Sequence, residues 1–148
     1  MGFTGWLFPN IPDANFANAI RSVCPTCIDA SNNLLPPATN LTILDVSNKN
    51  IADLTGIVGF TSLLQLNCAN NQLTILPALP TSLSWLFCEI NQITELPPLP
   101  NNLVVLYCGS NQLKKLPTLP NTLERLLCSN NQLTELPKLP NNLYLLIC

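Results

Sequence analysis

The sequence predicts a solenoid with a parallel β-sheet along one face and extended, polyproline-II-like return legs along the other. Four consecutive segments share the 20-residue pattern L-x-x-L-x-C-x-x-N-Q-[LI]-x-x-L-P-x-L-P-x-x, and they span residues 63–82, 83–102, 103–122 and 123–142. An irregular copy of 22 residues (41–62) precedes them, and a partial copy (143–148) follows. With such a short fixed period, each unit buries its apolar face only against its neighbours. We therefore expect one structural domain, with residues 1–40 as an N-terminal segment and cap and residues 41–148 as the solenoid.

The first six positions of each repeat indicate a strand. L-x-x-L-x-C alternates apolar and variable residues, which is the period of a strand with one buried face. Strands from successive copies run parallel and stack at about 4.8 Å per step. An asparagine follows where the chain turns away from the sheet, and its amide can bond backbone groups of neighbouring turns. We interpret these asparagines as structural; they are Asn71, Asn91, Asn111 and Asn131.

The second half of each repeat indicates the return leg, because it carries L-P-x-L-P. Two prolines in four residues exclude a helix and a central strand, and they favour polyproline II geometry. Twenty residues leave no room for a helix on the outer face, so we expect modest curvature. The four copies are residues 76–80, 96–100, 116–120 and 136–140.

The first forty residues predict a cap that shields the open N-terminal end of the solenoid. Asp13 is a candidate N-cap for a short helix from Ala14 to about Val23, with Phe16, Ile20 and Val23 on one face. The first repeat departs from the consensus, as terminal repeats usually do. It has Val46 in the cysteine position and Lys49 in the asparagine position.

Five of the seven cysteines recur every 20 residues and form a predicted cysteine ladder: Cys68, Cys88, Cys108, Cys128 and Cys148. Their position faces the core, where free cysteine behaves as a small hydrophobe, so we predict buried thiols. Parallel side chains about 4.8 Å apart are poorly placed for disulfides, whose Cβ atoms lie roughly 3.5–4.5 Å apart. Cys24 and Cys27 form a separate C-x-x-C pair, which fits either a local disulfide or two reduced cysteines.

Composition argues against several classes of function. Histidine is absent, which removes Ser-His-Asp and Cys-His mechanisms and the commonest general base, so we predict no enzyme. The formal charge of −2 and the scattered basic residues argue against nucleic acid as a partner. The sequence contains no run of about 18 consecutive apolar residues, so we predict no membrane insertion. The stretch from Met1 to Pro9 has no readable secretion signal, and no cofactor or metal is implied.

The candidate binding residues are variable positions on the strand face, since consensus positions are committed to packing. Stacking the third and fifth positions of each repeat predicts an outward-facing apolar patch with a polar edge. Aromatic residues also favour strands for their own sake, so the patch can instead be a tolerated surface. A protein, a peptide or the stacking face of a sugar would each suit it. The patch comprises Trp85, Phe87, Val105, Tyr107 and Leu127, and its edge comprises Arg125, Glu89 and Asn67.

The repeat pattern resembles leucine-rich repeats, and its 20-residue L-P-x-L-P form is similar to the short bacterial subclass. Residues 11–20 and 41–57 resemble the start of secreted repeat proteins of Bacteroidetes-type bacteria. The resemblance implies a secreted or cell-surface bacterial protein. Members of that family commonly carry a signal peptide and a C-terminal sorting or adhesion domain, and neither is visible in this chain.

Three functions remain open from the sequence. The leading hypothesis is a non-catalytic interaction module that uses its strand face. The second is a structural or self-assembling unit, because the apolar strand from Leu143 to Cys148 is uncapped and can pair with another chain; a fragment of a longer array would look the same. The third follows from the resemblance, since the short subclass occurs in effectors with ubiquitin-ligase domains: a recognition arm whose catalytic domain is absent.

Overall fold

The computed structural model describes residues 9–148. The expectation that the start of the chain holds no secretion signal concerns residues 1–9, nearly all of which lie outside the described part. Within the described part, no helix is long and apolar enough to cross a membrane.

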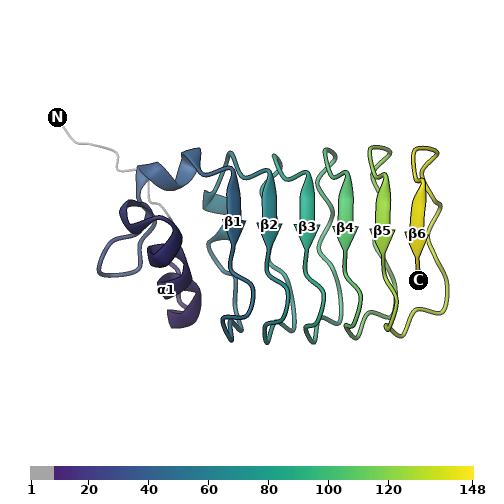
Figure 1. Cartoon of the computed structure of the whole chain (residues 1–148), viewed down its shortest axis with the longest axis horizontal. Helices are drawn as coiled ribbons and strands as arrows, with labels where there is room; N and C mark the ends of the chain where they lie inside the picture. The colour runs from purple at the N-terminus through teal and green to yellow at the C-terminus, as the bar shows by residue number, and fades with distance from the viewer. Residues whose placement is uncertain (1–8) are drawn as a thin grey trace.

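Six short parallel strands form one sheet, and their order in the sheet follows their order in the chain. Neighbouring strands pair in a register that joins equivalent positions of successive repeats, as in the pairing of Leu86 with Leu106. The central leucines of β1 to β5 are fully buried, while the residues on either side of them face outward. The predicted solenoid is therefore confirmed (Figure 1). The strands are β1 (Ile43–Asp45), β2 (Gln65–Asn67), β3 (Trp85–Phe87), β4 (Val105–Tyr107), β5 (Arg125–Leu127) and β6 (Leu145–Ile147).

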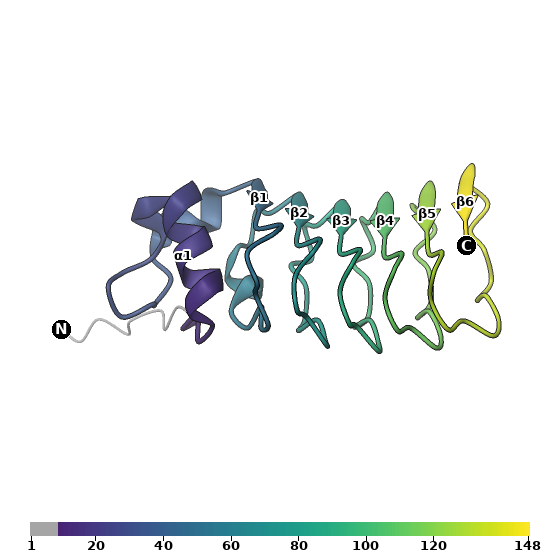
Figure 2. The ribbon, with the colours of Figure 1, turned by 60° about the horizontal axis from the view of Figure 1, so that its bottom comes forward.

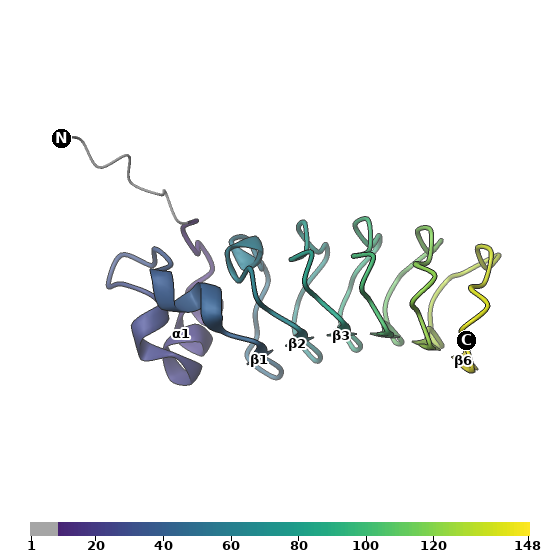
Figure 3. The ribbon, with the colours of Figure 1, turned by 90° about the horizontal axis from the view of Figure 1, so that it is seen from above.

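The return legs lie along the opposite long side of the solenoid from the strands (Figures 2 and 3). The four proline-rich legs contain neither helix nor strand, as their prolines predict. The leucines of the first three legs pack inward, and Leu76, Leu96 and Leu116 are each at most 6% exposed, whereas Leu136 on the last leg is 39% exposed. The longer first repeat has room for one 3₁₀ turn, η3 (Ile57–Gly59).

The asparagines form a row of hydrogen bonds that ties successive repeats together, which confirms their predicted structural role. Asn91 shows the arrangement: its Nδ2 donates to the carbonyl oxygens of Cys68 and Cys88, both at 3.1 Å. Its Oδ1 accepts from the backbone N–H of Leu73 at 3.0 Å. Each side chain thus bonds backbone groups on two turns where strand and return leg meet, and a carbonyl between two asparagines accepts from both, as that of Cys88 does.

The N-terminal cap contains the predicted helix, α1 (Ala14–Val23), which lies against the first repeat beside β1 (Figure 1). One Asp13 oxygen accepts the N–H of Phe16 at 2.9 Å and caps the helix. The other accepts the N–H groups of Ala52 and Asp53 at 2.9 and 3.1 Å. A single carboxylate therefore both starts the helix and fixes it to the solenoid.

One expected contact of α1 is wrong. Phe16 and Ile20 are buried as predicted, but Val23 is 46% exposed. The helix ends at Val23, and the chain turns there into η1 (Pro25–Cys27), so Cys27 takes the buried place instead. A second short turn, η2 (Pro36–Asn40), leads from the cap into β1.

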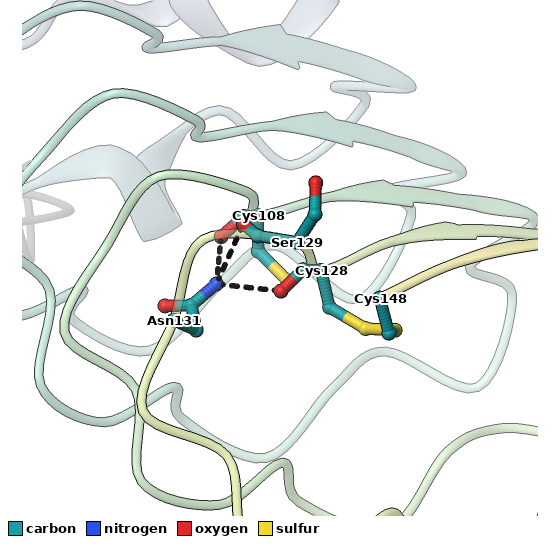
Figure 4. The surroundings of a disulfide bond; sticks show 5 residues. All are labelled: Cys108, Cys128, Ser129, Asn131 and Cys148. Atoms are coloured by element: carbon teal, nitrogen blue, oxygen red, sulfur yellow. Dashed lines mark hydrogen bonds between the residues drawn. A yellow bond between two sulfur atoms is a disulfide. The ribbon is translucent and has the colours of Figure 1, made fainter.

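The cysteines differ from the prediction at the end of the ladder. Cys68, Cys88 and Cys108 are buried free thiols, as predicted, and burial raises the pKa of Cys108 to about 12. Cys128 and Cys148, however, form a disulfide, so the argument against bonds between adjacent rungs is wrong there (Figure 4). Their Cα atoms are 4.5 Å apart, within the range of disulfides. Cys148 is exposed on the last rung, where no further repeat packs against it.

The C-x-x-C pair of the cap, which the sequence left open, is also a disulfide. The Cα atoms of Cys24 and Cys27 are 5.3 Å apart, which is a normal spacing for a bridged pair. The bond closes the short turn between α1 and η1.

Thiol counting tests this assignment. We expect alkylation of the unfolded, unreduced protein to label three cysteines, and labelling after reduction to reach all seven. In the folded protein the three thiols should react slowly, because burial raises the pKa of each one and so suppresses the reactive thiolate. Intact-mass spectrometry reads the number of labels. More than three labels without reduction would contradict the disulfide pairing.

Candidate binding face on the strand side

The sheet register assembles the predicted residues into two rows on the outward side of the strands. One row runs Trp85, Val105, Arg125, and the other runs Phe87, Tyr107, Leu127. Asn67 precedes Phe87 in the second row. The predicted neighbours are therefore brought together, because parallel pairing places equivalent repeat positions side by side.

Aromatic side chains dominate this face. Trp85 is 39% exposed, an unusual exposure for so large an apolar side chain. The rings of Phe87 and Tyr107 meet edge to face, with centroids 5.1 Å apart and planes at 71°. In β5, Arg125 Nε donates to the hydroxyl of Tyr144, the residue before β6, at 2.6 Å. The Arg125 guanidinium lies 5.4 Å from the centroid of the Tyr144 ring. These contacts join side chains of neighbouring repeats across the strand face.

Val105 does not belong to the exposed patch as predicted. It lies in the expected row, but only 6% of it is exposed. Its short side chain sits between the longer side chains of Trp85 and Arg125, to which its strand position pairs it on either side. It therefore supports these neighbours and offers little surface to a partner.

A groove of about 500 Å³ lies where β2, β3 and β4 end, and it contains four of the predicted residues: Asn67, Phe87, Glu89 and Tyr107. Trp85, Arg125 and Leu127 lie outside it. Its other lining residues were not predicted as site residues, and they are Ser47, Asn48, Gln65, Ala69, Asn70 and Ile90. A larger hollow of about 680 Å³ lies between two return legs and contains none of the predicted residues. We favour the groove because it combines the aromatic pair with an unpartnered carboxylate.

Glu89 is that carboxylate. It occupies a position that is Ala69 in the preceding repeat and Gly109 in the following one. Its Oε2 is buried and accepts no hydrogen bond from residues 9–148. Burial raises the pKa of Glu89, because the charged form loses water, and a hydrogen bond from its own backbone N–H offsets only part of this effect.

A neutral replacement should therefore stabilise the protein. We expect Glu89→Gln to unfold at higher temperature than the wild type at neutral pH. Because the folded-state pKa is raised, the carboxyl favours folding most when it is protonated, and this contribution is lost as pH rises through the raised pKa. The advantage of Glu89→Gln should disappear in acid, below the ordinary glutamate pKa of about 4.3. Thermal melts of both proteins at neutral and at acid pH measure the two differences in stability. A Glu89→Gln variant less stable than the wild type at neutral pH would contradict the account.

Ile90 is one of the six groove residues that pattern reasoning missed, and it is the one whose side chain suits its backbone conformation poorly. Its backbone has φ = 56°, in the left-handed region, where a β-branched side chain is a strained outlier. Equivalent positions of the other repeats share this conformation but carry residues that tolerate it better, namely Asn48, Asn70, Ser110 and Asn130. An isoleucine in a row of asparagine and serine was the sequence signal that could have found it. Ile90 is also 55% exposed, so the core does not require it.

Relief of this strain is measurable. We expect Ile90→Asn to raise the free energy of unfolding by about 1 kcal/mol, since asparagine reaches the left-handed region at lower cost. Ile75, which is 62% exposed on a return leg, provides the matched control, and Ile75→Asn should change stability little. Chemical denaturation of the two variants gives the comparison, and an equal effect at both sites would exclude strain as the cause.

Metal chemistry finds no support in the described part of the chain. Across residues 9–148, no three His, Cys, Asp or Glu side chains converge on a point that could hold a metal ion. The strand face offers aromatic surface, amides and the carboxylates of Asp45 and Glu89, and Asp45 already accepts a hydrogen bond from Asn67 at 3.1 Å. These groups are suited to recognition.

Comparison with solved structures decides the fold family. The chain is similar to the leucine-rich-repeat domain of a Shigella effector, with 31% identity and a TM-score of 0.76 over 91% of this chain and 56% of that one. The fold is a bacterial leucine-rich-repeat fold. The chain also resembles an internalin, InlF, from Listeria monocytogenes, at 20% identity and a TM-score of 0.67, over 89% of this chain and 49% of that one. No protein-family model and no curated protein matches the sequence.

A third solved structure is a leucine-rich-repeat domain described as including a cysteine ladder. The functional domain of InlJ from Listeria monocytogenes, which includes a cysteine ladder, is 26% identical with a TM-score of 0.51. The match covers 93% of this chain and 41% of that one. The chain thus spans about half the length of the structures it matches. The predicted leucine-rich-repeat fold is confirmed, while the 20-residue subclass and the Bacteroidetes resemblance stay predictions.

Proposed function

We propose that the chain is a non-catalytic interaction module that binds a protein or peptide through its strand face. The observation that carries the proposal is the exposed Trp85 beside the Phe87–Tyr107 pair. A sheet face turned to water is normally polar, and a contiguous aromatic surface marks an interaction site. Tryptophan, tyrosine and arginine are also the residues that contribute most to binding energy at interfaces, and Arg125 lies in the same rows.

The structural neighbours support a protein partner more than a glycan. The Shigella domain belongs to an effector, and the InlJ array is the functional domain of its protein. Leucine-rich-repeat domains present variable side chains on a constant scaffold, which is the arrangement seen on this strand face. The stacking face of a sugar remains the second choice of ligand.

Substitution on the two faces tests the proposal. A photo-crosslinking residue at position 85 should capture a defined partner that the same residue at position 75 does not. With that partner purified, Trp85→Ser and Tyr107→Ser should each weaken binding by about tenfold or more, as expected for contact residues at the centre of an interface. Calorimetry gives the affinities, and circular dichroism checks that each variant stays folded.

Ile75→Ser is the matched control, because it removes a large exposed side chain from the return-leg side. Its affinity should equal that of the wild type. Binding that survives both strand-face substitutions would refute the proposal, and so would binding that is lost in the control.

A second candidate is self-association through β6. This strand has a neighbour on one side only, and its core leucine, Leu146, is 39% exposed. On the last return leg, Leu136 and Leu139 are likewise 39% and 38% exposed. An unpaired strand with apolar surface behind it is a template for pairing with a second copy. Light scattering across a concentration series separates the two candidates: a stable monomer favours recognition of another protein, and a dimer or polymer favours self-assembly.

We further propose that the protein is exported from a bacterial cell. The two disulfides support this, since such bonds persist in oxidising compartments and are rare in the cytosol. A surface protein and a secreted effector fit this proposal equally. In the effector case, the chain is the recognition arm of a longer enzyme, and the similarity to the Shigella domain supports that alternative.

A further inference from the structure

We propose that the groove at the ends of β2, β3 and β4 binds a basic side chain, lysine or arginine, of the partner, with the Glu89 carboxylate as its counter-charge. This inference rests on the proposed function and names the chemistry of its central contact. The groove is the place on the strand face where an aromatic pair and a carboxylate adjoin.

The first argument is charge. Among residues 9–148 the one ion pair joins Lys115 to Glu95 at 3.7 Å, and it lies on the return legs, away from the groove. Glu89 has no such partner, and its Oε2 is buried without a hydrogen bond from the described residues. A buried acceptor left unpaired costs free energy, and a charged acceptor costs more. A neutral donor from the partner would remove part of that cost, and a cationic donor beside the carboxylate would remove most of it.

The second argument is the surroundings of the carboxylate. Phe87 and Tyr107 line the groove in an edge-to-face pair, which leaves ring surface available to a cation. Lysine and arginine carry a long apolar stem below the charge, and such stems pack along apolar surface. Ile90, exposed and held in a strained conformation at the rim, offers that surface. The groove thus has an apolar wall for the stem and a carboxylate for the charged end.

Other occupants fit less well. An acidic side chain would be repelled by Glu89. An apolar side chain would remove the remaining water from the carboxylate and leave it still unpaired. A neutral amide could donate one hydrogen bond but would leave the charge uncompensated, and for this reason it serves as the comparison in the test.

The test uses small probes and the intact chain. Nuclear magnetic resonance titrations would add acetyl-Gly-Lys-Gly-amide, the arginine equivalent, and the lysine peptide acetylated on its side chain. We expect the two basic peptides to shift the amide signals of Phe87, Glu89, Ile90 and Tyr107 and to saturate. The acetylated peptide keeps the stem and loses the charge, so it should bind about tenfold more weakly.

Two variants complete the design. Glu89→Gln should weaken the basic peptides by about tenfold and leave the acetylated one unchanged. Since Glu89→Gln is expected to be at least as stable as the wild type, weaker binding would not reflect unfolding. Glu135→Gln removes an exposed carboxylate from a return leg and should bind as the wild type does.

The results that would overturn the inference are specific. They are shifts outside the groove, equal binding of the acetylated peptide, unchanged binding by Glu89→Gln, or no saturable shift at high millimolar peptide. Failure here is separable from failure of the proposed function. If a purified partner loses affinity with Trp85→Ser but not with Glu89→Gln, the strand face is the interface and the basic side chain is not its central contact.

Discussion

Replacing Asn111 with alanine should lower the free energy of unfolding by about 3 kcal/mol and the melting temperature by roughly 10 °C. Its side chain is 8% exposed, and Nδ2 donates to the carbonyl oxygens of Cys88 and Cys108 at 3.0 and 3.1 Å. Its Oδ1 accepts the N–H of Ile93 at 3.0 Å. Alanine leaves the N–H of Ile93 without a partner in a buried place, which costs about 1–3 kcal/mol. The carbonyl oxygens of Cys88 and Cys108 each lose one of two amide donors, since Asn91 and Asn131 still bond them. Thermal and chemical denaturation measure the loss.

The control for Asn111 is Asn121, whose side chain is exposed at a turn between repeats. Asn121→Ala should change stability by only a few tenths of a kcal/mol, about the scatter of surface substitutions. Similar losses at the two sites would show that the asparagine row is not what joins the repeats.

Replacing Leu106 with alanine should cost about 3 kcal/mol, whereas the same change at Leu146 should cost about 1 kcal/mol or less. The two leucines occupy equivalent positions in β4 and β6, so propensity and local backbone are matched. Leu106 is fully buried between repeats on both sides, and Leu146 is 39% exposed. The difference therefore measures how much stability one repeat draws from its following neighbour. Equal losses would contradict a solenoid held together by neighbour contacts.

The repeat period made the architecture predictable. A strict spacing of 20 residues determines which residues pair across strands, and the pairing of Phe87 with Tyr107 follows from it. The asparagine row and the capping role of Asp13 were predictable for a related reason, since both depend on local hydrogen-bonding chemistry. Predicting these features does not require the distances between side chains.

Features that depend on size and separation were not predictable. Val105 is buried because its neighbours in the row are long, which a pattern of outward positions does not convey. The disulfide between Cys128 and Cys148 was missed because the strand spacing was compared with the Cβ separation of bridged cysteines, whereas the Cα separation of 4.5 Å lies within the range for disulfides. The unpartnered oxygen of Glu89 depends on which side chains reach it. In each case the repeat predicts where the residue lies in the solenoid, whereas its burial or bonding depends on the side chains around it.

Part of the candidate site was nevertheless visible in the sequence. Asn67, Phe87, Glu89 and Tyr107 line one groove, as their neighbouring repeat positions suggested. Ile90 was missed because the patch was built by stacking the third and fifth positions of each repeat, whereas the strain lies at position eight. A backbone conformation repeated in every turn becomes informative only when one copy carries an unsuitable residue.

The most direct test of recognition through the strand face is cross-saturation transfer from an unlabelled, purified partner to the amides of the labelled chain. The account predicts the strongest transfer at Trp85, Phe87, Glu89 and Tyr107, and little at Ile75 and Glu95 on the return legs. Transfer concentrated on the return legs or on β6 would contradict it, and would place the interface on the opposite face or at the open end of the sheet.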